Sequence, residues 1–64
     1  MKIAAAFTAL LHGHRIRRRE WQPDVFVMLV GHKKPRIRQR SERYCLQFQA
    51  SLRDIEADDW EIVK

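Results

Sequence analysis

Two arginine-rich segments carry the side chains best suited to binding an anion. The first segment holds Arg17, Arg18, Arg19 and, two residues later, Trp21. A guanidinium group binds phosphate through two parallel hydrogen bonds, and an indole offers a stacking surface for a base. Side chains alternate along a strand, so Arg17, Arg19 and Trp21 would share one face. This segment predicts a site for a phosphate-bearing nucleotide; the alternative is a solvated strand with Trp21 in the core.

The second segment follows Lys33-Lys34 and holds Arg36, Arg38 and Arg40. In a strand these three arginines would project from one face at intervals of roughly 6.7 Å, close to the phosphate repeat of a nucleic-acid strand. The spacing is compatible with binding of nucleic acid. It is equally compatible with an edge strand protected by charge, or with a contact to an acidic part of another subunit.

The charge of the 64-residue chain is unevenly distributed. The whole chain has 13 basic and 8 acidic residues, a formal charge of +5. Residues 1–49 contain 11 basic and 3 acidic residues, whereas residues 50–64 contain 2 basic and 5 acidic ones. The first part is therefore expected to meet an anionic partner, or to pair with the acidic end of the same or another chain.

Composition excludes several classes of protein. A lone cysteine, Cys45, forms no internal disulfide, so we expect a reducing, cytoplasmic setting and a small buried or half-buried Cys45 side chain. His12, His14 and His32 lack the ligand spacing of a zinc site, and the chain has neither a phosphate-binding loop nor a nucleophile–histidine motif. No apolar run is long enough to span a membrane, and the apolar start is too short for a signal peptide. We expect no catalysis, cofactor, metal or membrane contact.

A short amphipathic helix is predicted at the start of the chain, from about Ile3 to His12. Ile3, Ala6, Phe7 and Leu10 have the i, i+3, i+4, i+7 spacing of one helical face. Gly13 occupies the position of a left-handed C-terminal cap. A helix this short needs a partner for its apolar stripe.

The remaining pattern predicts a small antiparallel sheet. Strands are expected at residues 14–21, at 25–30 as a central strand buried on both faces, at 36–40 as a polar edge strand, at 44–48 with one apolar face, and at 60–63. Ser51 and Asp54 have the spacing of a capping box for one helical turn from Leu52 to Ala57. The chain is thus expected to form a single α+β domain, residues 1–64, with four to five strands and one short N-terminal helix packed on them.

Both ends of the chain match the pattern of a widespread bacteriophage and prophage domain. The matching residues are Ala6-Phe7, Leu10, Gly13, Ile16-Arg17-Arg18, Trp21 and the closing segment Ser51-Leu52-Arg53-Asp54-Ile55-Glu56-Ala57-Asp58-Asp59-Trp60-Glu61-Ile62-Val63. With these motifs the chain resembles the Thoeris anti-defence sponge family, second type, and its short relatives. The resemblance implies a compact α+β protomer that assembles, often as a tetramer. It also implies binding, without cleavage, of a cyclic ADP-ribose-type signal made by an immune TIR enzyme, or of a cyclic dinucleotide.

These observations together predict a non-enzymatic phage protein that sequesters a nucleotide immune signal in the host cell cytoplasm. The site would form in a homo-oligomer, a dimer or tetramer. Arg17, Arg18 or Arg19 would hold phosphate, Trp21 would stack, and the strand with Arg36, Arg38 and Arg40 would line or close the site. The alternative is an anti-CRISPR-like inhibitor or a nucleic-acid-binding protein that uses its arginine strands, with nucleic acid or a host defence protein as partner.

Overall fold

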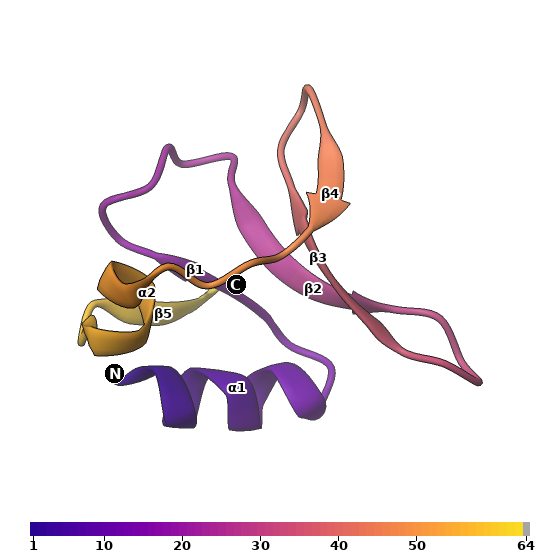
Figure 1. The fold of residues 1–64 in the computed structure, drawn as a ribbon, viewed down its shortest axis with the longest axis horizontal. Coiled ribbons are helices and arrows are strands. Elements are labelled where there is room, and N and C mark those ends of the chain that lie inside the picture. Colours follow the sequence, from indigo (N-terminus) through magenta and orange to yellow (C-terminus); the bar gives the residue numbers. More distant parts are fainter. Residues whose placement is uncertain (64) are drawn as a thin grey trace.

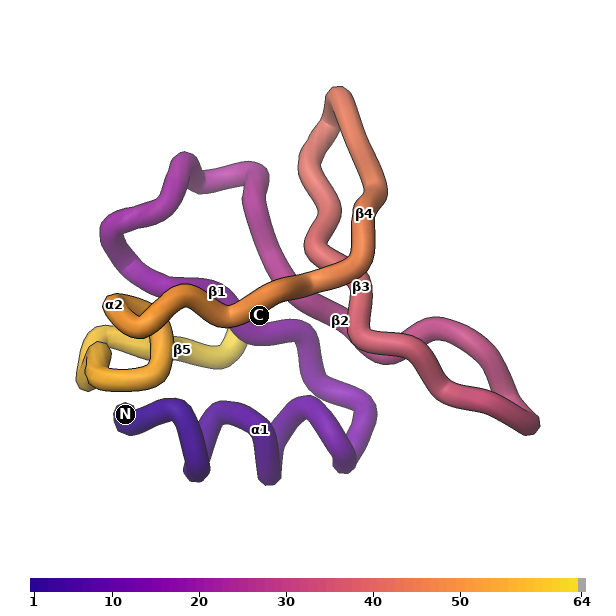
Figure 2. Tube along the Cα trace, in the orientation of Figure 1, coloured from indigo at the N-terminus to yellow at the C-terminus, as the bar shows by residue number. Residues whose placement is uncertain are grey.

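The computed structural model describes residues 1–63 and forms one antiparallel sheet with a helix across one face (Figures 1 and 2). The elements are α1 (Ile3–Leu11), β1 (Arg15–Arg18), β2 (Phe26–Val30), β3 (Arg36–Arg40), β4 (Cys45–Gln47), α2 (Leu52–Glu56) and β5 (Trp60–Val63). The strand order across the sheet is β4-β3-β2-β1-β5. This arrangement confirms the predicted α+β fold class. None of the helices within residues 1–63 combines the length and the apolar character needed to cross a membrane.

Helix α1 forms and ends where its sequence predicts. Ala6 and Leu10 are buried at the centre of its apolar stripe. The helix stops because Gly13 adopts φ of +93°, a left-handed conformation that costs glycine little. The Gly13 N–H donates to the Leu10 carbonyl and the His14 N–H donates to the Ala9 carbonyl, and these are the two hydrogen bonds of a Schellman cap.

Strand β2 lies at the centre of the sheet, but the prediction that both its faces are buried is wrong. Val27 is fully buried beneath α1, whereas Met28 on the other side is half-buried and Val30 is exposed. Helix α1 packs against β1, β2 and β5 on one face only. Within residues 1–63 no second layer of helices covers the other face, so alternate side chains of the apolar strand β2 are in contact with solvent.

Strand β1 is shorter than predicted and ends at Arg18 rather than Trp21. The Trp21 N–H donates to the Arg18 carbonyl at 3.1 Å, which turns the chain away from the sheet. The Trp21 ring then packs edge-on against Trp60, at a centroid distance of 5.3 Å, and against Phe48, at 6.2 Å. Trp21 therefore lies against the core and does not share a strand face with Arg17 and Arg19.

The β3–β4 hairpin corrects two further predictions. Strand β3 is not an edge strand, because β4 pairs with it; the edges of the sheet are β4 and β5. On the predicted apolar face of this segment only Phe48 packs against the core, whereas Tyr44 is 38% and Leu46 49% exposed. Cys45, on the other face, is exposed and not buried or half-buried as expected. Figure 1 shows the reason, since this hairpin extends away from α1, which therefore leaves the inner side of β4 uncovered.

The closing segment anchors the last strand. Ser51 and Asp54 form the predicted capping box at the start of α2, with each side chain bonded to the other residue's backbone N–H. Strand β5 then places Trp60 and Ile62 on one face, which the register shows to be the face of Ile16. Trp60 is fully buried, and its indole Nε1 donates to the Asp54 carbonyl at 2.9 Å.

Adjacent leucines in α1 test this packing. Leu10 is 1% exposed and Leu11 is 73% exposed. Leu10→Ala removes a core side chain and should lower the free energy of unfolding by about 2–5 kcal/mol. Leu11→Ala, the matched control, should change it by less than about 0.5 kcal/mol. Urea unfolding followed by tryptophan fluorescence measures both; equal losses would show that α1 does not pack as described.

Candidate anion-binding face

The face of the sheet opposite α1 carries most of the arginines. The register places Ile16 beside Val27 on the helix-covered face, so their strand neighbours point the other way. We call this second surface the open face; it consists of Arg15, Arg17, Phe26, Met28, Val30, Arg36, Arg38, Arg40, Cys45, Gln47, Glu61 and Val63. Five of these twelve residues are arginine, and one is acidic. The open face is therefore strongly basic.

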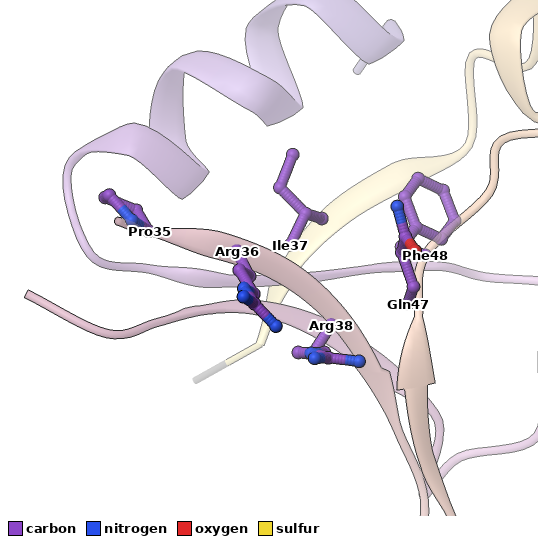
Figure 3. Close-up of a pocket in the computed structure, with 6 residues that line it drawn as sticks. All are labelled: Pro35, Arg36, Ile37, Arg38, Gln47 and Phe48. Carbon is purple, nitrogen blue, oxygen red and sulfur yellow. The ribbon is translucent and has the colours of Figure 1, made fainter. Parts of the chain in front are cut away.

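The three arginines of β3 form a row along this face. Arg36, Arg38 and Arg40 stand opposite Val30, Met28 and Phe26 of β2. Figure 3 shows Arg36 and Arg38 on the side of β3 away from Ile37, as the predicted alternation requires. Within residues 1–63, none of the three makes a salt bridge. Their positive charge is available to a partner.

Guanidinium groups also cover the apolar floor of the open face. The Arg15 guanidinium lies over the Phe26 ring, 5.2 Å from its centroid. The Arg40 Nη1 lies 3.8 Å from the Met28 sulfur. Long arginine stems shield apolar surface while keeping their charged ends in water. The floor is thus aromatic and apolar, but it presents positive charge to solvent.

Two hollows border this surface, and the lining of the first also includes Ile37 and Phe48 from the covered side. One, of about 470 Å³, is lined by Pro35, Arg36, Ile37, Arg38, Gln47 and Phe48 (Figure 3). The other, of about 520 Å³, includes Arg15, Phe26 and Arg40, and also the carboxylates Asp24 and Glu42. Both volumes fall in the range of small-molecule sites, roughly 300–1,000 Å³. The first is the more basic because its lining contains no acidic residue.

Arg17 lies on the open face but is engaged by the protein itself. Its Nη1 donates to Glu61 at 2.6 Å, and its Nη2 donates to the Trp21 carbonyl at 2.7 Å and the Gln22 carbonyl at 3.3 Å. These bonds fasten the β1–β2 loop to β5. Its Nε is buried without a hydrogen-bond partner.

Arg18 lies on the opposite, helix-covered side, where it is buried among carboxylates. Its Nε donates to Asp59 at 2.8 Å, and its Nη1 lies 3.0 Å from Asp54 and 3.1 Å from Glu20. The bond from Arg18 lowers the pKa of Asp59. Burial acts to raise the pKa of Asp54, but bonds from the Ser51 backbone and from Arg18 outweigh it, so that pKa is also lowered. The acidic end of the chain thus pairs with the first arginine segment within one chain.

The structure divides the predicted site residues between two sides of the sheet. Arg17 and the row of Arg36, Arg38 and Arg40 lie on the open face, whereas Arg18 belongs to the covered side and Trp21 packs into the aromatic cluster. Arg19 follows β1, with its side chain 74% exposed and its Nε 3.6 Å from Glu61. Within one chain, the indole of Trp21 is not beside the β3 arginines.

Sequence reasoning missed the other members of the open face. Arg15, Phe26 and Met28 contribute to it because β2 pairs with β3, and β1 pairs with β2, so the alternation of side chains continues across the three strands. Strict period-two alternation in residues 25–30 would have revealed this arrangement. The continuous apolar run masked it, since a run without polar residues is also typical of a strand buried on both faces.

The fold and this surface define a class: a small α+β domain whose single sheet is covered by a helix on one side and presents arginines on the other. The chain matches the Tad2-like family, the Thoeris anti-defense 2-like domain, over residues 1–63. It therefore belongs to that family, and this membership suggests a role in Thoeris anti-defence. A comparison with curated proteins finds no match.

Neighbouring arginines test the buried ion-pair cluster. Arg18→Gln would leave Asp54 and Asp59 without their cation and should lower the free energy of unfolding by about 3–5 kcal/mol. Arg19→Gln removes the same charge from a side chain that is mostly exposed, and should cost less than about 1 kcal/mol. Thermal and urea unfolding compare the two variants. Similar costs for both would contradict the assigned role of Arg18.

The lowered pKa values of Asp54 and Asp59 predict a loss of stability in acid. A carboxyl whose folded pKa lies below its ordinary 3.8 stabilises the fold above that value and ceases to do so as the pH falls through the folded pKa. The urea midpoint should therefore be steady above about pH 5 and fall below about pH 4. Asp59→Asn should be less stable at neutral pH and show a shallower acid decline. Asp58→Asn, at an exposed neighbour, should keep the full decline; a shallower one there would refute the assignment.

Proposed function

We propose that this protein is a non-enzymatic anti-defence protein that binds and sequesters a nucleotide immune signal. The signal would be of the cyclic ADP-ribose type or a cyclic dinucleotide. Membership of the Thoeris anti-defense 2-like family supports the anti-defence role. Sequestration requires only tight, reversible binding, which a chain of 64 residues can supply without a catalytic centre.

The observation that carries the proposal is the row of β3 arginines without carboxylate partners among the described residues. Arg36 and Arg38 share the hollow of about 470 Å³ with Gln47. Two guanidinium groups and an amide can bind the oxygens of a pyrophosphate or of two phosphodiesters. The apolar floor of Phe26 and Met28 lies on the adjacent strand, where it can contact a base or ribose.

The first arginine segment has a different part in this proposal. Arg17 and Arg18 donate their hydrogen bonds to other residues of the protein, so they would stabilise the strands that carry the site. Arg19 is the member with an exposed guanidinium and would meet phosphate from the end of β1. Trp21 packs against the core, and its ring is half-exposed. It would stack on the nucleotide only if the nucleotide, or a second chain that carries it, reached the covered side of the sheet.

A homo-oligomer, a dimer or tetramer, completes the proposed site. The hollow around Arg36 and Arg38 is lined by residues 35–38 and 47–48 alone. Small-ligand sites usually bury most of the ligand surface. A second copy placed over this hollow would enclose the ligand and add apolar contact to a domain with a small core.

Titration calorimetry with cyclic ADP-ribose isomers and cyclic dinucleotides tests the proposal. We expect binding to at least one of them, with Arg38→Gln weakening it about tenfold or more because a charged hydrogen bond is lost. Arg53→Gln, at an exposed arginine on α2, is the matched control and should bind normally. A stoichiometry below one ligand per chain would support sites shared between copies.

Ligand recovery gives an independent arm of the same test. Protein purified from cells that make the signal should release it, chemically unchanged, when heated, as read by mass spectrometry. Absence of binding at ~100 μM to every nucleotide tested would refute the proposed function, because a sponge must bind well below that concentration.

A further inference from the structure

We infer that the open face also binds single-stranded nucleic acid, with the β3 arginines along the phosphodiester backbone and the β2 floor against the bases. This activity goes beyond the proposed function, since a polymer and a small cyclic nucleotide make different demands on the surface. The argument rests on charge balance, on the linear arrangement of the cations and on the floor beside them.

Charge balance favours a partner that brings its own negative charge. Among the described residues, Asp54, Asp59 and Glu20 pair with Arg18, and Glu61 pairs with Arg17 and Arg19. A second copy has four further carboxylates within residues 1–63, but nine basic side chains there likewise form no salt bridge, so its own free cations outnumber the carboxylates it could offer. Arg15 and the β3 row have no such pairs within residues 1–63. The open face is complementary to an external polyanion.

The cations follow a line rather than a cluster. Alternate residues of a strand are separated by roughly 6.7 Å, so the three β3 arginines extend over more than one phosphate. Lys33 and Lys34 precede Arg36 in the β2–β3 loop and add positive charge at that end of the row. Figure 1 shows this loop projecting from the body of the protein. A linear charged polymer can contact the whole line, whereas a small anion uses only part of it.

The floor beside the row favours a single strand over a duplex. Phe26 and Met28 are half-buried, and they lie directly opposite Arg40 and Arg38 on the neighbouring strand. Because the Arg15 guanidinium lies over the Phe26 ring, an unpaired base would stack on that guanidinium and contact Met28 beside it. A duplex keeps its bases inside the helix and offers no such contact. Asp24 and Glu42 border the Arg40 end, so the positive potential is greatest toward Arg36.

Fluorescence anisotropy with a labelled single strand of about 12 nucleotides, DNA and RNA in turn, tests the inference. Phosphate contacts to the three β3 arginines account for a slope of about −2 for log K against log salt concentration, and contacts to Lys33 and Lys34 make the slope steeper. Arg36→Gln/Arg38→Gln should reduce that slope by about 1.4 and weaken binding about 25-fold at 0.1 M salt. The control, Lys2→Gln/Arg53→Gln, removes equal charge from exposed residues of α2 and the start of α1 and should bind within about twofold of the parent.

The remaining arms separate the inference from its rivals. Arg36→Lys/Arg38→Lys retains the charge and should keep most of the binding, and urea unfolding checks that every variant is folded. Equal losses in the open-face and control variants would reduce the effect to net charge and overturn the inference. Equal affinity for a duplex or for polyglutamate would also overturn it. Calorimetry with cyclic dinucleotides is scored separately, so either activity can fail without the other.

Discussion

The buried guanidinium of Arg18 is the constraint on which the rest of the structure depends. It joins three parts of the chain: β1, the start of α2 through Asp54, and the turn before β5 through Asp59. Placing such charges away from water is costly unless they are paired and hydrogen-bonded, so these segments have one favourable arrangement. Trp60 is the residue after Asp59, and its indole N–H donates a hydrogen bond to the Asp54 carbonyl. The cluster thereby holds β5 beside β1 and closes the core.

The same pairing determines which surface remains charged. Because the acidic end neutralises the first arginine segment, the cations of β3 are left unmatched among the described residues. Helix α1 has nine residues and covers one side of the sheet only. A domain this small cannot bury both faces of its sheet. The surface proposed to bind the ligand is thus the face of the sheet that α1 does not cover, and arginine stems shield its apolar floor.

Much of the local structure could be predicted from the sequence because local rules govern it. The spacing of Ala6 and Leu10, the position of Gly13 and the Ser51–Asp54 capping box each act within a few residues. The alternation of Arg36, Arg38 and Arg40 likewise fixed their common face. Predictions that depended on neighbouring layers did not hold: β2 is covered on one side, and Cys45 lies on an exposed edge strand. Burial depends on where α1 reaches, which no local pattern contains.

By itself the sequence determined the α+β class, the family, the C-terminal cap of α1, the capping box of α2 and the presence of two arginine segments with an acidic end. Only the tertiary structure decided what each arginine does. Arg17 and Arg18 are adjacent in the sequence. Arg17 lies on the open face and donates hydrogen bonds to the β1–β2 loop, whereas Arg18 is buried among carboxylates on the covered face. Strand alternation separates such neighbours, and the long-range approach of Asp54 and Asp59 selects which of them is neutralised. Charge counted along the chain cannot reveal this division, because pairing depends on distances set by the folded sheet.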